Sequence, residues 1–264
     1  MIESQLDGSI LTIHIARPGK KNALTRDMRA ELRAAFEAAQ ANDDVRAVIL
    51  SGRGESFCSG ADVEALTQSE GPPNGGPDPK RARHRMKFYA HGMIKALQDI
   101  EKPVICAVRG HAAGIGWSLA LACDLTIASD TAKFSAIFAR RGLVPDGGCA
   151  WFLARLIGLA RARDIIFSSR FVAAPEALAL GLVHQVVPDE DLASASLALA
   201  QELANMPTFA LGMAKRMLQQ AVAPGLESFL DYEAALQAQM MMTADFQEGV
   251  AAFAEKRPAK FTGR

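Results

Sequence analysis

Asp146 is the acidic residue whose sequence setting best suits acid–base chemistry. It lies in GLVPDGGCAW (142–151), between a proline and two glycines and among apolar residues. Burial in apolar surroundings raises the pKa of a carboxyl group and makes it a better base. Pro-Asp-Gly is also typical of a turn, and an Asp before Gly147 can cap the next helix. Spacing alone therefore leaves Asp146 as either a turn residue or a working acid or base.

Two glycine-rich turns could stabilise negative charge. The predicted strands 45–50 and 103–108 end in GESFCSGAD and RGHAAGIG, and a predicted helix follows each turn. Such turns expose backbone N–H groups, and the helix dipole adds positive potential. Side by side, the two turns could bind one developing oxyanion; losing such a donor costs about 3–4 kcal/mol in rate.

Other catalytic motifs in the sequence are incomplete. Gly114-Ile115-Gly116 begins like a dinucleotide fingerprint, but Leu119 replaces the third glycine. No phosphate-binding loop sequence occurs. Ser118 falls inside a predicted helix rather than at a strand-to-helix turn, which argues against a serine hydrolase. The four cysteines form no C-x-x-C pair, so we expect reduced thiols and no metal site.

The composition favours a globular protein with a large core. The chain has 264 residues, of which 50% are hydrophobic, and its formal net charge is zero. That balance points away from nucleic-acid or membrane partners. The longest apolar stretch, near 115–122, is too short to cross a bilayer, and the N-terminus has no signal-peptide pattern. We expect a cytoplasmic protein.

Short apolar strands alternate with helices up to about residue 190, and only helices follow. This pattern predicts an α/β fold with a parallel or mixed sheet covered on its faces. We expect a core at 1–190 and a helical region at 191–264. The predicted strands are 10–15, 45–50, 103–108, 125–128, 133–137 and 183–187. The predicted helices are 25–41, a short one that follows GESFCSGAD, 80–99, 117–123, 151–157, 160–167, 175–180, 189–205, 208–221, 225–243 and 245–256, and a loop is expected at 69–79.

Several stretches, in order, resemble the enoyl-CoA hydratase/isomerase (crotonase) superfamily. They are ARPGKKNAL, SFCSGADV, KPVICAVRGHAAGIGWSLALACDLTIAS, AKFSAIFARRGLVPDGGCAWFLARLIG, APEALALGLVHQVVP and EGVAAFAEKR, and together they cover nearly the whole chain. The resemblance implies a crotonase-like ββα spiral core and a C-terminal helical trimerisation region. It implies homotrimers or hexamers, an acyl-CoA thioester substrate and no separate cofactor, since coenzyme A is part of the substrate.

The resemblance also implies roles for individual residues. The two oxyanion donors fall on the backbone N–H groups of Ala61 and Ile115. An N–H donor needs no particular side chain, so the isoleucine is compatible with this role. Coenzyme A would lie near the basic loop and the first glycine-rich turn. The residues implied for it are Lys20, Lys21, Ala23, Ser59, Gly60 and Asp62, with Arg17 as a further candidate for its phosphates.

The sequence departs from the hydratases at both of their catalytic glutamates. Ser118 and Phe138 stand at those two positions, and neither side chain can transfer a proton at neutral pH. Asp146 is the carboxylate that remains. Its surroundings resemble the isomerase branch of the family, in which an Asp moves a proton between carbons of a CoA thioester. Phe138, Trp117 and Ile137 would then shield that proton from water.

Two alternatives remain open at this point. In the 4-chlorobenzoyl-CoA dehalogenases an Asp at this place is a nucleophile, a His corresponds to His91, and an aromatic residue corresponds to Phe138. That branch should have a Trp-rich pocket, whereas this chain has two Trp residues. The second alternative is a catalytically silent acyl-CoA-binding member of the family. His91 is otherwise a packed or surface histidine.

Overall fold

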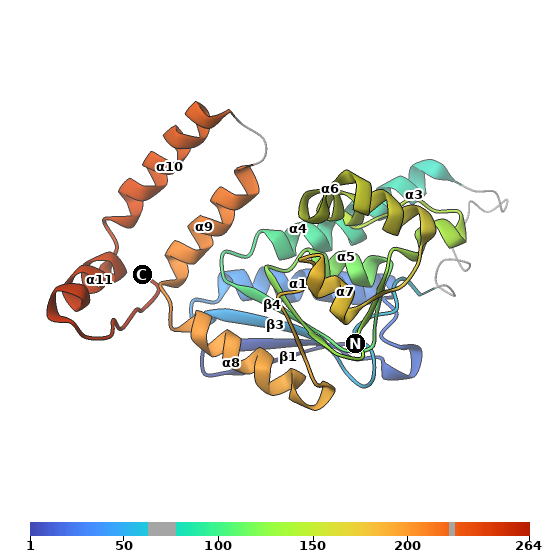
Figure 1. Ribbon diagram of the computed structural model, residues 1–264, viewed down its shortest axis with the longest axis horizontal. Helices are drawn as coiled ribbons and strands as arrows, with labels where there is room; N and C mark the ends of the chain where they lie inside the picture. The colour runs from blue at the N-terminus through green and yellow to red at the C-terminus, as the bar shows by residue number, and fades with distance from the viewer. Residues whose placement is uncertain (63–77, 222–224) are drawn as a thin grey trace.

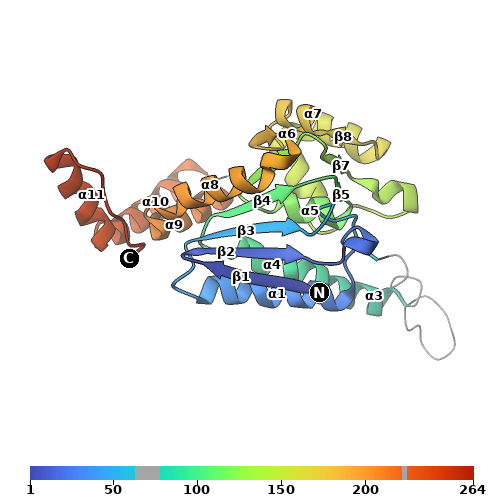
Figure 2. The same cartoon turned by 90° about the horizontal axis from the view of Figure 1, so that it is seen from below.

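The main body of the molecule is built on a six-stranded sheet, and Figures 1 and 2 show it with helices packed around it. The structure is a computed structural model, and it describes residues 1–62, 78–221 and 225–264. The strand order is β1-β2-β3-β4-β6-β9. β1 is antiparallel to β2, and the other neighbouring pairs are parallel. The predicted α/β class with a mixed sheet is confirmed. The strands are β1 (Ile2–Asp7), β2 (Ile10–Ile15), β3 (Ala47–Gly52), β4 (Val104–Val108), β6 (Leu125–Ser129) and β9 (Gln185–Val187).

Helices cover both faces of this sheet, because its central strands are apolar on both sides. On β3, Val48 and Leu50 belong to one buried cluster, and Ala47 and Ile49 belong to another. This is the alternation expected of a strand. Figure 2 shows α1 and α4 on one side of the sheet and α8 on the other. These helices are α1 (Arg26–Ala41), α4 (Gly92–Gln98) and α8 (Leu192–Ala204).

Helix α1 begins where the sequence predicts. The side-chain oxygen of Thr25 accepts a hydrogen bond from the Met28 N–H at 3.2 Å, which satisfies one of the unbonded donors of the first turn. Met28, Leu32 and Phe36 are buried. Arg29 follows Met28 and is itself only partly exposed, so α1 carries one arginine at the edge of its buried face.

A smaller sheet, three α-helices and one 3-10 helix lie beside the main sheet. The small sheet has the order β5-β7-β8. The residues of α5 are all buried, and α6 contains a non-helical residue, Gly158, with φ 75°. These elements are β5 (His111–Ala113), β7 (Lys133–Ser135), β8 (Val172–Ala173), α5 (Ile115–Leu121), the 3-10 helix η3 (Ile137–Arg141), α6 (Cys149–Ser168) and α7 (Ala174–Ala179).

The C-terminal helices stand away from the sheet. Figure 1 shows α9, α10 and α11 extending to one side of the molecule. They are α9 (Thr208–Gln220), α10 (Leu226–Met240) and α11 (Ala244–Glu255), so the helical C-terminal region is confirmed. The domain boundary at 190/191 stays a prediction; α8, which follows it, shares a buried cluster with the main sheet.

Several elements differ from the prediction. The helix expected at 80–99 consists of α3 (Pro79–Arg85), the π-helical η2 (Met86–His91) and α4. The strand expected at 133–137 ends at Ser135 because β7 pairs with β5 over only three residues, and η3 follows. The strands β1, β5 and β8 were not predicted. The helix expected after GESFCSGAD and most of the expected loop 69–79 lie outside the described residues. None of the helices in the described part of the chain has both the length and the apolar character of a membrane span.

Candidate active site

The two glycine-rich turns touch each other. The segment after β3 pairs with β5: the Cys58 N–H donates to His111 O, and the Ala113 N–H donates to Cys58 O, both at 2.9 Å. A Cβ atom on Gly60 would lie only 2.9 Å from Ala113 O, and one on Gly114 would lie 3.9 Å from the Gly60 Cα. Glycine at both positions therefore allows the two backbones to meet, at φ values of +108° and +54°.

The residue after each of these glycines offers a backbone donor. The Leu24 N–H donates to Gly60 O and the Asp62 N–H donates to Leu24 O. In an extended segment the intervening Ala61 N–H points the other way. Ile115 is the first residue of α5, so its N–H has no acceptor within the helix. Among the described residues, neither N–H has a hydrogen-bond acceptor. Two such amides on touching turns can stabilise one oxyanion.

The Asp146 turn packs on the first turn of α5. The Ser118 hydroxyl lies within hydrogen-bonding distance of two carbonyl oxygens, 2.9 Å from Asp146 O and 3.2 Å from Gly114 O. A Cβ on Gly147 would lie 2.9 Å from Ser118 Cβ and 3.3 Å from Ile115 Cγ1. The same helical turn therefore fixes both the Asp146 backbone and the Ile115 amide.

The Asp146 side chain is partly desolvated, and one of its carboxylate oxygens has no hydrogen-bond partner among the described residues. This atom, Oδ1, is buried. Burial raises the pKa of Asp146, while the charges of Arg29 and His91 oppose that rise. A carboxylate with a raised pKa and a free lone pair is suited to accept a proton from carbon.

Arg29 is a site residue that the sequence reasoning missed. Its Nε is buried and has no partner among the described residues. Its Nη2 donates to Leu24 O at 3.3 Å, beside the segment that carries Ala61. Burial lowers the pKa of Arg29, and Asp146 opposes this shift. Nothing in the helical pattern distinguishes Arg29 from a solvated arginine, so the sequence offered no signal.

The expected pocket residues lie in different settings. Ile137 and Phe138 lie against the second turn, since a Cβ on Gly114 would be 3.7 Å from Ile137 Cγ2 and 3.9 Å from Phe138 Cε1. Trp117 is buried in the core, where its ring packs against Phe134 at 5.8 Å between centroids. Core packing accounts for Trp117, and its place in a pocket stays a prediction.

Ser118 and His91 complete the expected pocket. Ser118 is fully buried, and its hydroxyl is engaged by the two carbonyl groups described above. His91 is the last residue of the π-helical segment η2 and is exposed. Its positive charge opposes the rise in the pKa of Asp146 less strongly than that of Arg29 does.

The residues expected to bind coenzyme A border the first turn. Lys20 and Lys21 are exposed, and the Ser59 N–H donates to Lys21 O at 2.9 Å. The Ser59 hydroxyl is 3.4 Å from Lys20 O. Ala23 is half-buried, and its carbonyl oxygen accepts a hydrogen bond from Arg17. The basic loop and the first turn are thus joined through backbone contacts.

Two further side chains hold this loop in place. Asp62 is buried and forms an ion pair with Arg17, so both have a structural role. Asn22, which the sequence reasoning did not single out, is fully buried at φ +56°. Its side-chain amide donates to Ser56 O at 2.6 Å and to Arg53 O at 2.9 Å.

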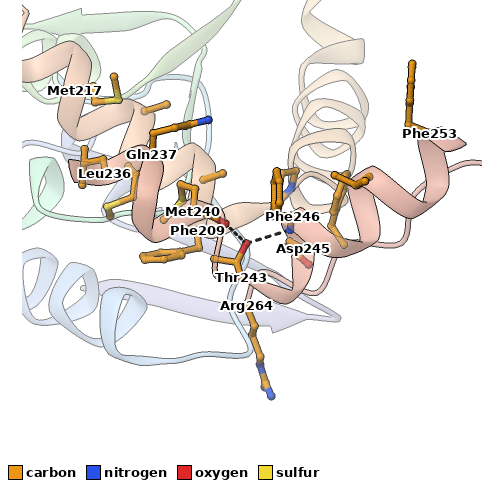
Figure 3. Close-up of a pocket in the computed structure, with 17 residues that line it drawn as sticks. Phe209, Met217, Leu236, Gln237, Met240, Thr243, Asp245, Phe246, Phe253 and Arg264 are labelled. Atoms are coloured by element: carbon orange, nitrogen blue, oxygen red, sulfur yellow. Dashed lines mark hydrogen bonds between the residues drawn. The ribbon is translucent and has the colours of Figure 1, made fainter. Parts of the chain in front are cut away.

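The structure also contains a large apolar cavity far from Asp146 along the chain. It measures about 580 Å³ and lies among α9, α10 and α11 (Figure 3). Its walls include Met213, Leu236, Met240, Phe246 and Phe253. Within the described residues, no group of His, Cys, Asp and Glu side chains is arranged to hold a metal ion.

Comparison with known proteins decides the family. The sequence model described as Enoyl-CoA hydratase/isomerase matches residues 5–264. The chain belongs to this family. It is 37% identical over 263 residues to 1,2-epoxyphenylacetyl-CoA isomerase of Escherichia coli K12, covering 100% of this chain and 98% of the relative. A probable enoyl-CoA hydratase of Rhodobacter capsulatus is 36% identical over 263 residues, covering 100% of this chain and 98% of the relative.

Two further matches define what the family membership implies. 4-Chlorobenzoyl coenzyme A dehalogenase-2 of Arthrobacter is 32% identical over 225 residues, covering 85% of this chain and 79% of the relative. The crystal structure of a putative enoyl-CoA hydratase/isomerase from Mycobacterium abscessus matches with a TM-score of 0.93, 32% identity and full coverage of both chains. This enoyl-CoA hydratase/isomerase family member therefore has the crotonase fold, as expected, and is an acyl-CoA enzyme. Its relatives include isomerase, hydratase and dehalogenase, so the family alone does not choose the reaction.

Proposed function

We propose that this enzyme is an acyl-CoA isomerase that moves a proton, and with it a double bond, within an enoyl-CoA thioester. One observation carries the proposal: the Asp146 carboxylate is partly buried, has an unbonded Oδ1 among the described residues, and is anchored to the same helical turn as the Ile115 amide. The similarity to an isomerase at 37% identity supports it. Hydration by two glutamates is disfavoured, because Ser118 and Phe138 occupy their positions.

In the proposed reaction, the thioester carbonyl oxygen accepts hydrogen bonds from the N–H groups of Ala61 and Ile115. Asp146 removes a proton from the α-carbon of a β,γ-unsaturated thioester. The C–H electron pair enters a dienolate, whose negative charge gathers on the oxygen between the two amides. The protonated Asp146 returns the proton to the γ-carbon, which restores the carbonyl and leaves an α,β double bond. One base can serve both steps because its raised pKa makes the proton easier to hold between them.

The rest of the proposed site follows from its surroundings. Ile137 and Phe138 exclude water from the carbon that carries the charge. The pantetheine and phosphates of coenzyme A lie along the first turn and the basic loop, near Ser59, Gly60, Lys20 and Lys21. Asp62 contributes by holding Arg17 and the loop in position.

We further propose that the chain works as a homotrimer or as a pair of trimers. The support is the apolar lining of the cavity among α9, α10 and α11, which includes the exposed side chain of Phe253. A second copy covering this region would bury that surface. Molecular mass measured by light scattering should be three or six times the 28.2 kDa of the chain.

The test of the proposed reaction is solvent-deuterium exchange. The wild-type protein should incorporate deuterium into a β,γ-unsaturated acyl-CoA in heavy water, and Asp146→Asn should not. Asp231→Asn is a matched control, because it removes an exposed carboxylate on α10. Full exchange by a folded Asp146→Asn protein would refute the proposal. If the wild type binds acyl-CoA tightly but catalyses no exchange, the result would instead indicate a catalytically silent acyl-CoA-binding protein.

A dehalogenase-type reaction is the second candidate. It is favoured by the effect of His91 on Asp146 and by the 32% identity to a 4-chlorobenzoyl-CoA dehalogenase. Here Asp146 would attack the halogen-bearing ring carbon, halide would leave, and water would hydrolyse the resulting ester. After a single turnover in heavy-oxygen water, one ¹⁸O atom in the Asp146 peptide would support this route. An unlabelled peptide after complete turnover would exclude it.

A further inference from the structure

Residues 144–148, the segment that carries Asp146, have one hydrogen-bonded link to a distant element within the part of the chain that the structure describes. This link is the Ser118 hydroxyl on α5, which lies 2.9 Å from Asp146 O. The other hydrogen bonds of the segment run to α6, which follows it directly; the Cys149 N–H, for example, donates to Asp146 O at 3.1 Å. The position of the Asp146 carboxylate relative to α5 therefore depends on Ser118.

The hydroxyl of Ser118 is not needed to satisfy either of the carbonyl groups beside it. Gly114 O, 3.2 Å from the hydroxyl, already accepts a hydrogen bond from the Ser118 N–H at 3.1 Å, and Asp146 O already has the backbone donor described above. A hydroxyl has one proton to donate, and Asp146 O is the nearer acceptor. Serines inside helices commonly bond the carbonyl four residues back, as Ser196 on α8 does with Leu192 O at 2.7 Å. The Ser118 hydroxyl differs because it links its helix to a separate segment.

The link also sets the relation between Asp146 and one oxyanion donor. Ser118 lies three residues after Ile115, which is one turn further along α5. The segment packs on this turn, since a Cβ on Gly147 would lie 2.9 Å from Ser118 Cβ and 3.3 Å from Ile115 Cγ1. A base must lie at a fixed place relative to the donors that hold its substrate, and a displacement of about 1 Å can slow a reaction about 10²-fold.

We propose that Ser118 is a positioning residue, which holds the Asp146 carboxylate at the distance from the Ile115 amide that proton transfer requires. The inference rests on the proposed function in taking Asp146 as the base. It gives a role to the serine that stands where the family resemblance places a hydratase glutamate. In this chain the side chain at that position transfers no proton and instead fixes the geometry of the carboxylate that does.

The test compares Ser118→Ala with Ser196→Ala. Each change removes one buried hydroxyl from a helix, but Ser196 lies on the opposite side of the main sheet and bonds within its own helix. Ser118→Ala should lower kcat for deuterium exchange by about 10- to 100-fold. It should change the dissociation constant of hexanoyl-CoA by less than about threefold, because the backbone amides and the basic loop remain. Ser196→Ala should change neither quantity. If Ser118→Ala fails to fold, Ser118→Cys keeps a weaker donor and should show the same changes to a smaller degree.

Crystal structures of the two variants measure the positioning without a substrate. In Ser118→Ala the distance from Asp146 Cγ to Ile115 N should change by about 1 Å, or the electron density of residues 144–148 should weaken. In Ser196→Ala both should match the wild type. An unchanged, well-ordered Asp146 in Ser118→Ala, or a kcat within about twofold of the wild type, would overturn the proposal. Absence of exchange by the wild type would instead refute the proposed function, and the crystal structures would still decide whether Ser118 positions Asp146.

Discussion

Replacing Gly60 with alanine should test whether the Ala61 amide stabilises the thioester oxyanion. Gly60 has φ +108°, and an added Cβ would lie 2.9 Å from the carbonyl oxygen of Ala113. Ordinary van der Waals contact begins near 3.4 Å, so one of the two backbones must move by about half an ångström. Either movement changes the geometry of the amides at Ala61 and Ile115.

The size of the effect follows from the role of these donors. Loss of one oxyanion donor lowers kcat by about 10²- to 10³-fold, which is about 3–4 kcal/mol in the barrier. A non-glycine residue at this φ also strains the backbone by about 1–3 kcal/mol. Gly60→Ala should therefore raise the activation barrier by more than it lowers the free energy of unfolding, and it should change KM less than kcat.

The assay compares Gly60→Ala with Gly8→Ala. Gly8 also has a positive φ, +57°, but a Cβ there meets nothing within 4 Å, and it lies in the turn between β1 and β2. Both variants should lower the melting temperature, whereas only Gly60→Ala should slow deuterium exchange, measured at a temperature where both are folded. Exchange by Gly60→Ala within tenfold of the Gly8→Ala rate would show that the Ala61 amide does not bind the oxyanion.

Two further predictions follow from the buried titratable groups. Asp146→Asn should stabilise the protein at pH 7. Burial raises the pKa of Asp146 in the folded state above its value in the unfolded state. The free energy of unfolding of the wild type therefore falls as the pH rises from the unfolded-state pKa through the folded-state pKa. The gain in the free energy of unfolding is about 1.4 kcal/mol for each unit by which the two pKa values differ, and it should vanish near pH 3, below the unfolded-state pKa. Thermal melts of both proteins at pH 7 and pH 3 measure this gain. An equal gain at both pH values would contradict this reasoning. Burial raises the pKa of the Cys58 and Cys149 thiols to about 12. Neither thiol should therefore react with iodoacetamide at pH 8 until the protein unfolds. Fast labelling of either residue in the folded protein, detected by mass spectrometry, would refute this prediction.

The sequence predicted the elements that local pattern determines. Capping chemistry predicts the N-terminus of α1 at Thr25. Apolar spacing predicts the C-terminal helices and the buried strands β3, β4 and β6. Gly158 separates two predicted helices, and the structure has a non-helical φ at that residue. The short strands β5 and β8 escaped prediction, because two or three residues carry no periodic signal and pair only through contacts distant in sequence.

The candidate site was predictable in its backbone and less so in its side chains. The glycines before Ala61 and Ile115 indicate that two backbone segments approach each other closely, and in the structure the two glycine-rich turns do so. Asp146 was identified by the absence of other acids at the family positions. Arg29 was not identified, because its burial depends on tertiary packing around α1 that the helical pattern does not show. The role of the fully buried Asn22 was not predictable, because its two carbonyl partners, Arg53 and Ser56, lie more than thirty residues away in the sequence.

The pairing of Cys58 with Ala112 has a consequence for how the enzyme matures. It joins segments more than fifty residues apart, and Asp146, which packs on the second segment, lies further along the sequence. Contacts so distant in sequence form late, since the entropy of closing the intervening loops must be overcome first. A nascent chain that ends before residue 146 carries helices and strands but lacks the carboxylate of the proposed site. During refolding, recovery of turnover should therefore lag behind recovery of helical circular dichroism.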